Sequence, residues 1–492
     1  MTRVSVDPAH SLGDVDRNVF GGFVEHLGRC IYGGLYEEGS PLADASGFRR
    51  DVLDVLRGLR MGVLRWPGGN FVSNYHWIDG IGPKDTRPRR PELAWGGEES
   101  NRFGTDEYLA YCAELGTEPY ICLNMGTGTL EEALAWIEYC NGAGDTEWAR
   151  RRAEGGHPEP YRVRYWGLGN EMYGDWQVGA LSAGEYTRIA TRWAKAIRML
   201  DPQAKLISCG MNGWNDWDRV VINELAPLVD YHSLHIYTGS GDYWNDVLQP
   251  HQAERAIRIT RALLERAAYT KKLPAAPQIA YDEWNVWFRT EDSTLEERYT
   301  FPDALAVATY LNIFLRNAGW VKMANLAQMV NVIAPVVTTP TGLAFQPIYY
   351  PVLLHAAAAL DVAVDVHVTG PVVSPPGLDQ PGRWPHRIAD LGPFSLVDAA
   401  ATMSAGRDKL AVTLVNRSPD EPETVDLVLR DLVFSGEARI QCVTAERDPG
   451  SRILPDVEGA CLEEGSETPK DSTLTLTLPP QSFTVVEVAT LR

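Results

Sequence analysis

Short apolar runs alternate with longer amphipathic stretches over most of the chain, beginning near Val19. This alternation is typical of buried strands separated by helices, as in a parallel sheet whose faces are covered by helices. We identify eight strand–helix units. The predicted strands are 19–25, 62–66, 118–124, 163–169, 205–210, 231–235, 278–283 and 321–328. The predicted helices are 49–59, 105–115, 130–141, 183–200, 218–225, 251–268, 302–317 and 347–360.

Local start signals support the helices. The segment Ser182-Ala-Gly-Glu185 matches the capping box, in which serine and glutamate side chains satisfy the free amides of a helix N-terminus. Eight consecutive units predict a closed (β/α)8 TIM barrel, a fold of about 250 to 400 residues with insertions. The chain has 492 residues, so we expect a second domain.

The pattern changes after Leu360. Residues 370–393 are rich in proline and glycine, and the segments 410–415, 425–429 and 473–478 then alternate apolar and polar positions. A period of two predicts half-buried antiparallel strands, and hence a β-sandwich of jelly-roll type. We therefore expect an α/β barrel at 17–360 and a C-terminal sandwich at 361–492. Residues 1–16 are expected to contribute a strand to the sandwich.

Composition and charge narrow the class of ligand. Hydrophobic residues make up 45% of the chain and charged residues 22%, which is typical of a globular protein. The net charge of −20 argues against a nucleic-acid partner, which needs a basic face, and favours a neutral ligand over an anionic one. The 15 tryptophans and 20 tyrosines supply rings that could stack on sugars as well as fill cores.

The cysteines and the hydropathy pattern indicate the cellular compartment in which the protein is expected. Seven cysteines are scattered without a Cys-x-x-Cys pair, which fits neither a disulfide framework nor a zinc ribbon. The N-terminal segment lacks an apolar signal core, and no segment offers about 18 uninterrupted apolar residues. We expect a cytoplasmic protein that does not associate with membranes.

Weak cofactor and metal signals can be set aside. His232 and His235 would point to opposite faces of a strand, and no third ligand accompanies them. Gly167 and Gly169 lack the third glycine and the acidic residue of a dinucleotide-binding loop. The run 150–152 of three arginines is expected in a solvated loop. We predict no cofactor and no bound metal.

Polar residues gather where the predicted strands end, which in a barrel is the catalytic face. The strand-end residues are Glu25, His26, Arg65, Asn70, Asn170, Glu171, His235, Tyr237 and Glu283. Glu171 and Glu283 each lie beside an asparagine but are 112 residues apart, so only a fold that gathers distant strand ends can unite them. Neighbouring carboxyls in a water-poor cleft differ in pKa, which is what glycoside cleavage requires of its acid and its carboxylate.

Four segments carry a family resemblance. They are Phe23-Val-Glu-His-Leu-Gly-Arg29, Arg65-Trp-Pro-Gly-Gly-Asn-Phe71, Trp166-Gly-Leu-Gly-Asn-Glu-Met172 and Asp282-Glu-Trp-Asn-Val-Trp287. They resemble the motifs of clan A glycoside hydrolases, and within that clan of family 51, the intracellular α-L-arabinofuranosidases. The resemblance spans both predicted domains. It implies an exo-acting enzyme that removes terminal arabinofuranose from arabino-oligosaccharides, and it implies a homohexamer.

The resemblance also implies residue roles. Glu171 would be the acid/base and Glu283 the nucleophile of a retaining double displacement, with carboxyls roughly 5 to 5.5 Å apart. Asn170 would bind the hydroxyl next to the anomeric carbon, and Tyr237 and His235 would position Glu283 and keep it ionised. The outer hydroxyls would be bound by Glu25, Asn70 and Gln346, and the aglycone would be framed by Trp95 and Trp287.

Two alternatives remain open at this point. Related clan members attack β-linked glucans or xylans, and the barrel mouth alone does not distinguish these substrates. A carbohydrate-binding protein with a vestigial site is the other alternative, although both glutamates and their supporting residues are present.

Overall fold

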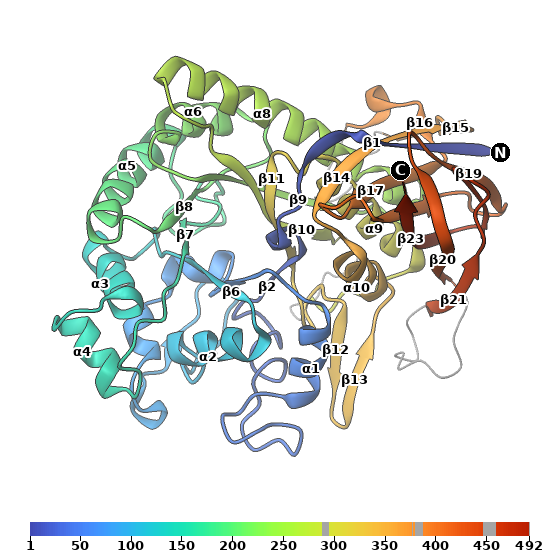
Figure 1. Ribbon diagram of the computed structural model, residues 1–492. Coiled ribbons are helices and arrows are strands. Elements are labelled where there is room, and N and C mark those ends of the chain that lie inside the picture. The colour runs from blue at the N-terminus through green and yellow to red at the C-terminus, as the bar shows by residue number, and fades with distance from the viewer. Residues whose placement is uncertain (288–294, 376, 379–386, 446–458, 492) are drawn as a thin grey trace.

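The computed structural model describes residues 1–287, 295–375, 377–378, 387–445 and 459–491 (Figure 1). Eight parallel strands close into a barrel in the order β10-β11-β2-β3-β6-β7-β8-β9, as the sequence predicts. Their bounds are β2 Gly21–Phe23, β3 Val63–Trp66, β6 Glu118–Cys122, β7 Tyr165–Leu168, β8 Lys205–Ser208, β9 Tyr231–Thr238, β10 Gln278–Val286 and β11 Val321–Ala327.

Helices surround the barrel, and all eight predicted helices are present (Figure 1). They are α1 Arg50–Gly58, α2 Thr105–Leu115, α3 Leu130–Asn141, α5 Ala183–Leu200, α6 Asp216–Leu225, α8 His251–Lys271, α9 Phe301–Arg316 and α10 Tyr349–Ala358. The capping box predicted before α5 forms, because the Glu185 amide donates to Ser182 Oγ and the Ser182 amide donates to Glu185 Oε2. Within the described residues, no helix has the length and apolarity needed to cross a membrane.

Some element bounds differ from the prediction. Val19 and Phe20 belong to a 3-10 helix, Arg17–Phe20, which is capped by Asp16, so β2 begins only at Gly21. β9 and β10 run three residues beyond their predicted ends. Buried strand pairing continues to their ends, where Val286 pairs with Thr238. This extension places Tyr237 within a strand.

Two helices were not predicted, α4 Glu147–Glu154 and α7 Tyr243–Leu248. The expectation that the arginine run 150–152 lies in a loop is therefore wrong, whereas Arg150 and Arg151 are exposed to solvent as expected. Arg152 is buried, and its guanidinium donates to the backbone carbonyls of Tyr139, His157 and Pro158. Arg152 therefore links the backbone of α3 to the segment that follows α4 and leads to β7.

The C-terminal part forms a nine-stranded sheet in the order β21-β20-β23-β18-β17-β14-β1-β19-β22. Its strands are β1 Thr2–Asp14, β14 Val362–Thr369, β17 Val397–Met403, β18 Lys409–Asn416, β19 Glu423–Leu429, β20 Val433–Thr444, β21 Cys461–Glu467, β22 Thr473–Leu478 and β23 Ser482–Leu491. The N-terminal β1 lies antiparallel to β14 and parallel to β19. We propose the division 17–360 and 361–492, with 1–16 assigned to the second unit.

Two apolar clusters hold this sheet in place. One lies inside the folded sheet and includes Val4, Val412, Leu427 and Val486. The other joins the sheet to the barrel, where Ala304, Leu305 and Ala308 of α9 pack with β18 and β23. Helix α9 is buried on nearly all sides because it is covered by the barrel and the sheet together. The sheet therefore covers the flank of the barrel and leaves the strand ends open.

Candidate active site

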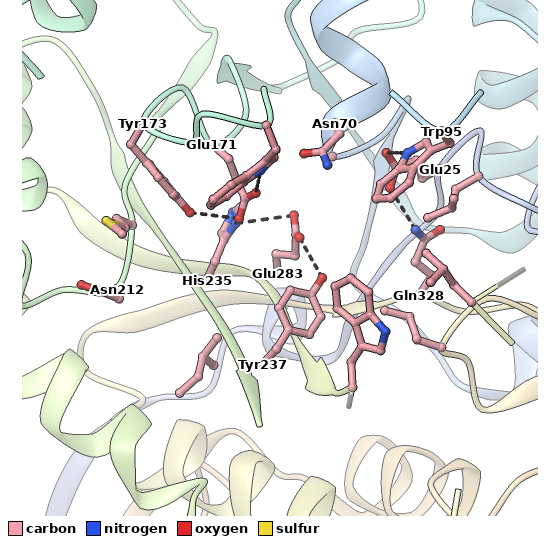
Figure 2. Close-up of a pocket in the computed structure, with 18 of the residues that line it drawn as sticks. Glu25, Asn70, Trp95, Glu171, Tyr173, Asn212, His235, Tyr237, Glu283 and Gln328 are labelled. Carbon is pink, nitrogen blue, oxygen red and sulfur yellow. Dashed lines mark hydrogen bonds and ion pairs between the residues drawn. The ribbon is translucent and has the colours of Figure 1, made fainter. Parts of the chain in front are cut away.

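The main candidate site is a pocket of about 380 Å³ at the C-terminal ends of the barrel strands, within the usual range for small-molecule sites (Figure 2). Figure 2 shows Glu171, Tyr173 and His235 on one side and Glu25, Trp95 and Gln328 on the other, with Glu283 between them. Its lining residues are Glu25, Leu27, Gly69, Asn70, Trp95, Glu171, Tyr173, Trp176, Met211, Asn212, Trp214, His235, Ile236, Tyr237, Glu283, Trp287, Leu295, Gln328 and Ile333.

Glu283 lies within β10 and is only 7% exposed. The Tyr237 hydroxyl donates to its Oε1 at 2.7 Å, and Arg65 Nη1 donates to its Oε2 at 2.9 Å. Each carboxylate oxygen thus accepts one hydrogen bond, and one of the two donors is charged. This arrangement fixes the Glu283 carboxyl group in one orientation at the lining of the pocket.

Arg65 organises the base of the pocket. Its guanidinium also donates to Asn170 Oδ1 at 2.5 Å and to the Asp282 carbonyl at 3.0 Å. The Asp282 carboxylate accepts from Tyr120 at 2.7 Å and from Ser233 at 2.5 Å. Burial alone would raise the pKa of Asp282, but Arg65 and His235 outweigh it and hold that pKa well below its usual range. Asp282 is therefore a permanent negative charge beneath the site.

Glu171 follows β7 in a strained backbone conformation. Gly169 has φ +79°, and Glu171 itself has φ +42°, in the left-handed region that non-glycine residues rarely adopt. Such strain costs about 1 to 3 kcal/mol and persists only where the surroundings enforce it. It turns the Glu171 side chain into the pocket, where Oε1 accepts from the Tyr173 hydroxyl at 2.9 Å and Oε2 accepts from Trp176 Nε1 at 3.2 Å.

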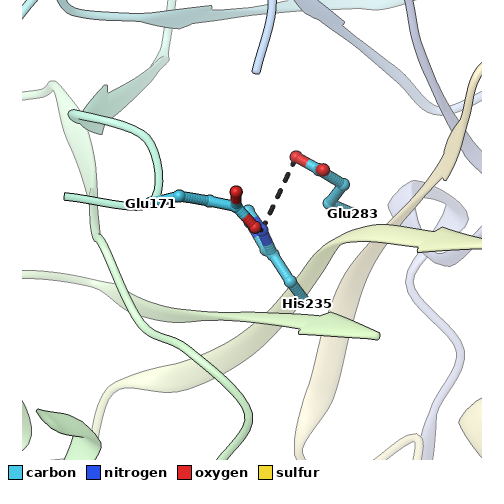
Figure 3. Close-up of side chains that lie close together, drawn as sticks. All are labelled: Glu171, His235 and Glu283. Atoms are coloured by element: carbon cyan, nitrogen blue, oxygen red, sulfur yellow. Dashed lines mark hydrogen bonds and ion pairs between the residues drawn. The ribbon is translucent and has the colours of Figure 1, made fainter. Parts of the chain in front are cut away.

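His235 connects the two glutamates (Figure 3). Its Nδ1 lies 2.9 Å from Glu171 Oε1 and 3.6 Å from Glu283 Oε2. Burial alone would lower the pKa of His235, but the charge of Glu283 and hydrogen bonds to Asp282 and Glu171 raise it to about 10. The protonated imidazole balances the surrounding negative charge. Its hydrogen bonds go to Glu171 and Asp282, and its contact with Glu283 is an ion pair at 3.6 Å, so the expectation that it positions Glu283 and keeps it ionised stays a prediction.

The same three side chains have the geometry of a possible metal site, because their ligand atoms lie within 4.8 Å of one another. With its raised pKa, His235 is protonated at neutral pH, and a protonated imidazole has no lone pair for a metal. The Arg65 guanidinium beside Glu283 would also repel a cation. We therefore interpret the cluster as a pair of carboxyls bridged by a proton donor.

Glu25 lies on the opposite wall and is fully enclosed. Its Oε1 accepts from the Phe71 amide and from Trp95 Nε1, both at 3.0 Å, and its Oε2 accepts from Gln328 Nε2 at 3.0 Å. Burial raises the pKa of Glu25 to about 7, opposed by the hydrogen bonds from Phe71 and Trp95 and assisted by the charge of Glu283. Glu25 therefore titrates near neutral pH.

This raised pKa predicts a pH-dependent stability. Between pH 4.5 and 7 the folded state holds a proton on Glu25 that the unfolded state has released, so its contribution to stability falls as pH rises. The Glu25→Gln variant cannot titrate. The variant's unfolding free energy minus that of the wild type should increase by about 3 kcal/mol across this window. Thermal unfolding at pH 4.5, 5.5, 6.5 and 7.5 measures it, and a constant difference would contradict the assignment.

Two protein-family models match this chain. Residues 55–255 match the description "Alpha-L-arabinofuranosidase 1 domain", and residues 282–482 match "Alpha-L-arabinofuranosidase C-terminal domain". A probable α-L-arabinofuranosidase C of Aspergillus flavus is 48% identical over 94% of this chain and 93% of its own. The arabinose complex of the Thermotoga maritima α-L-arabinofuranosidase is 40% identical, with a TM-score of 0.91 over 99% of this chain and 100% of its own.

The chain belongs to the α-L-arabinofuranosidases of glycoside hydrolase family 51. A further relative, named an intracellular exo-α-(1→5)-L-arabinofuranosidase of Streptomyces lividans, is 36% identical over 99% of this chain and 75% of its own length. The family resemblance seen in the sequence is confirmed, and so is the arrangement of a barrel followed by a C-terminal sheet domain. Membership makes the chain a glycoside hydrolase.

The structure of this family 51 chain places most of the predicted site residues together. Those lining the pocket are Glu25, Asn70, Trp95, Glu171, His235, Tyr237, Glu283 and Trp287. Asn170 lies buried beneath them, held by Arg65. Trp287 packs edge-on against Tyr237, with ring centroids 5.3 Å apart. Trp95 contributes an indole N–H to Glu25 as well as an aromatic face.

The expectation that Gln346 binds the sugar needs correction. It is completely buried and does not line the pocket; its amide nitrogen donates to the carbonyls of Glu297 and Ala334, and its oxygen accepts from the Tyr299 amide. These backbone partners use its hydrogen-bonding capacity. The glutamine that reaches Glu25 is Gln328, directly after β11. In the structure, Gln346 fixes the neighbouring loops, and Gln328 takes the place expected for it.

Several further pocket residues were not predicted. Tyr173 and Trp176 follow Glu171 closely, while Asn212 and Trp214 come from the loop after β8. Arg65 and Gln328 carried one detectable signal, since each lies at the end of a predicted strand. The loop residues carried none, because their positions depend on how the connections after β7 and β8 fold.

The loop after β8 is itself held by a buried Ser-His-Asp arrangement. His232 Nδ1 lies 3.0 Å from Ser208 Oγ, and His232 Nε2 lies 3.0 Å from Asp218 Oδ1. Asp218 also accepts from the amides of Met211 and Gly213, at 2.7 and 2.9 Å. Since Ser208, His232 and Asp218 are at most 1% exposed, no substrate reaches them. This triad is structural, and His232 faces away from the pocket that contains His235.

Proposed function

We propose that this chain is a retaining, exo-acting α-L-arabinofuranosidase that releases terminal non-reducing arabinofuranose from arabino-oligosaccharides. The observation that carries the proposal is the pairing of Glu171 with Glu283, since one carboxylate oxygen of Glu171 lies within 4.8 Å of one carboxylate oxygen of Glu283. Retaining glycosidases keep their carboxyls about 5 to 5.5 Å apart, whereas inverting enzymes need about 6.5 to 9.5 Å to admit a water. The short separation favours a covalent intermediate.

Glu171 and Glu283 have different surroundings, and we assign them different roles in the reaction. Glu283 is the nucleophile: its carboxylate attacks the anomeric carbon, and the bond from that carbon to the glycosidic oxygen breaks. Glu171 donates its proton to the departing oxygen. In the second step Glu171 takes a proton from a water that attacks the same carbon, and the bond to Glu283 breaks. Tyr237 and Arg65 support the charge that returns to Glu283.

Recognition of the sugar is proposed to use the base of the pocket. Asn170 Nδ2 is buried without a hydrogen-bond partner, while Arg65 fixes its Oδ1, so the free N–H group is available for a sugar hydroxyl. At Gly69, a Cβ atom would lie 3.4 Å from Glu25 Oε2, 3.5 Å from Glu283 Oε2 and 3.6 Å from Asn170 Nδ2. A side chain there would occupy the space in which a furanose can contact all three groups.

The polar groups of the pocket suggest how the substrate lies. Glu25, Gln328 and Asn70 line the pocket opposite Glu171 and offer polar groups for the outer hydroxyls of a terminal sugar. Trp95 and Trp287 line the same pocket, and we propose that they frame the aglycone.

A substrate panel tests the proposal. The purified protein should hydrolyse 4-nitrophenyl α-L-arabinofuranoside with a kcat/KM at least about 100 times that for the β-D-xyloside and the β-D-glucoside. A preference for the β-linked substrates would support the clan's other specificities. Binding of arabino-oligosaccharides without any hydrolysis would instead indicate a carbohydrate-binding protein.

We also propose a cytoplasmic homohexamer that acts in arabinan catabolism and supplies L-arabinose for metabolism. The name of the Streptomyces relative, which calls that protein intracellular, supports the compartment. The hexamer is supported by the family resemblance alone. Light scattering tests it, with a mass six times 54.5 kDa as the expected result.

A further inference from the structure

Trp176 is a pocket residue whose contact with Glu171 the double displacement does not use. It follows the acid/base in the β7–α5 connection, and its side chain is largely exposed, at 55%. Glu171 Oε1 already accepts hydrogen bonds from Tyr173 and His235. Among the described residues, Trp176 Nε1 is the only side-chain donor to Oε2. The two oxygens of the acid/base are therefore not equivalent.

This asymmetry fixes where the catalytic proton can sit. Oε1 accepts two hydrogen bonds and has no room for a proton, so the proton that Glu171 gives to the glycosidic oxygen must be carried on Oε2. In the structure the indole N–H donates to that atom at 3.2 Å. A protonated carboxyl oxygen is a weaker acceptor than a carboxylate oxygen, so the indole hydrogen bond favours the ionised form of Glu171 and is weakened when Oε2 carries the proton.

We propose that Trp176 is a positioning residue that keeps Glu171 ionised in the free enzyme and leaves Oε2 when a leaving-group sugar packs against its indole ring. Glu171 then takes up from solvent water the proton that it transfers to the glycosidic oxygen. This inference rests on the proposed function. The hydrogen bonds from His235, Tyr173 and Trp176 outweigh burial, which would raise the pKa of Glu171, and hold that pKa below its ordinary value.

The surroundings of the indole allow such a movement. Trp176 contacts Tyr173 edge-on at 6.2 Å between ring centroids, and its other surface is open to solvent. It also lies over Gly174, where an added Cβ would meet the indole Cε2 at 2.4 Å. The indole thus has its place only because residue 174 has no side chain. Trp214, also exposed in this pocket, extends the aromatic surface available to an aglycone.

The pH profile of kcat/KM tests the inference, because its alkaline limb reports the acid of the free enzyme. Trp176→Phe keeps a ring but removes the N–H, and Gly174→Ala displaces the indole without changing it. In both variants the alkaline limb for an arabino-oligosaccharide should move to higher pH by about 0.5 unit or more, the effect of one lost neutral hydrogen bond. The matched control is Trp214→Phe, whose indole makes no described bond to either glutamate, and it should leave the limb in place.

The outcomes separate this inference from the proposed function. A wild-type protein that hydrolyses no α-L-arabinofuranoside would overturn the function itself. An active wild type whose alkaline limb is unmoved in Trp176→Phe and Gly174→Ala would overturn only the role of Trp176. An equal movement in Trp214→Phe would also overturn it, because any aromatic substitution in the pocket would then have the same effect.

Discussion

Replacing Glu283 with alanine is expected to lower kcat for every α-L-arabinofuranoside by on the order of 10,000-fold or more. The variant lacks the group that forms the covalent bond, and no other described carboxylate is held at the same place by Tyr237 and Arg65. The loss should be the same for a poor and a good leaving group, because attack on the anomeric carbon is required in both cases. Steady-state rates with an oligosaccharide and with a 2,4-dinitrophenyl glycoside measure it.

Glu171→Ala is the matched variant. Without the acid, kcat/KM for the oligosaccharide should fall by about 100-fold to 10,000-fold. The dinitrophenolate leaves without protonation, so kcat/KM for that substrate should fall by less than about 10-fold. Unfolding temperatures within a few degrees of the wild type would show that both variants are folded. If both variants depended equally on the leaving group, the two glutamates would not have different roles.

Arg65→Met is expected to affect both stability and catalysis. The guanidinium is 1% exposed, bonds Glu283, Asn170 and the Asp282 carbonyl, and lies 3.9 Å from the Asp282 carboxylate. Its removal leaves the buried carboxylates of Glu283 and Asp282 with His235 as the cation that still contacts both. Breaking a buried ion pair from one side costs about 3 to 5 kcal/mol of unfolding free energy. We expect kcat/KM to fall by about 100-fold or more as Glu283 and Asn170 lose their orientation. Calorimetry and initial rates measure the two effects.

Arg65→Lys is the control for charge alone. Lysine keeps the positive charge, but a single ammonium cannot hold Glu283 Oε2 and Asn170 Oδ1 with the geometry of a planar fork. It should recover most of the lost stability and little of the lost activity. Equal activity in the lysine variant and the wild type would show that the fork has no positioning role.

The sequence allowed the barrel to be predicted because its strands are continuous apolar runs that end in polar residues. The C-terminal ends of the strands lie at one face of a barrel regardless of loop conformation. The sequence therefore allowed us to predict that four residues lie close together: Glu25, Glu171, Tyr237 and Glu283. The bounds of a strand were harder to predict where the residues of the strand and of the adjoining turn are both apolar. Val19 and Phe20 are apolar, yet they form a 3-10 turn because Asp16 caps it.

What the sequence could not provide came from three-dimensional contacts. Gln328 and Gln346 are both glutamines after the last barrel strand, and only the structure shows that backbone groups occupy Gln346 while Gln328 bonds Glu25. Similarly, the preference of His235 for Glu171 depends on a difference between 2.9 and 3.6 Å. Differences of this size are set by strand register and side-chain rotamers, which a linear pattern does not encode.

The configuration of azide adducts tests the assignment of roles most directly. In Glu171→Ala, azide should attack the covalent intermediate on Glu283 and give an arabinofuranosyl azide of retained α configuration. In Glu283→Ala, azide should enter the space left by the nucleophile and displace the leaving group once, giving the β azide. Proton NMR of the isolated products distinguishes the two anomers. A β azide from Glu171→Ala, or an α azide from Glu283→Ala, would contradict the account.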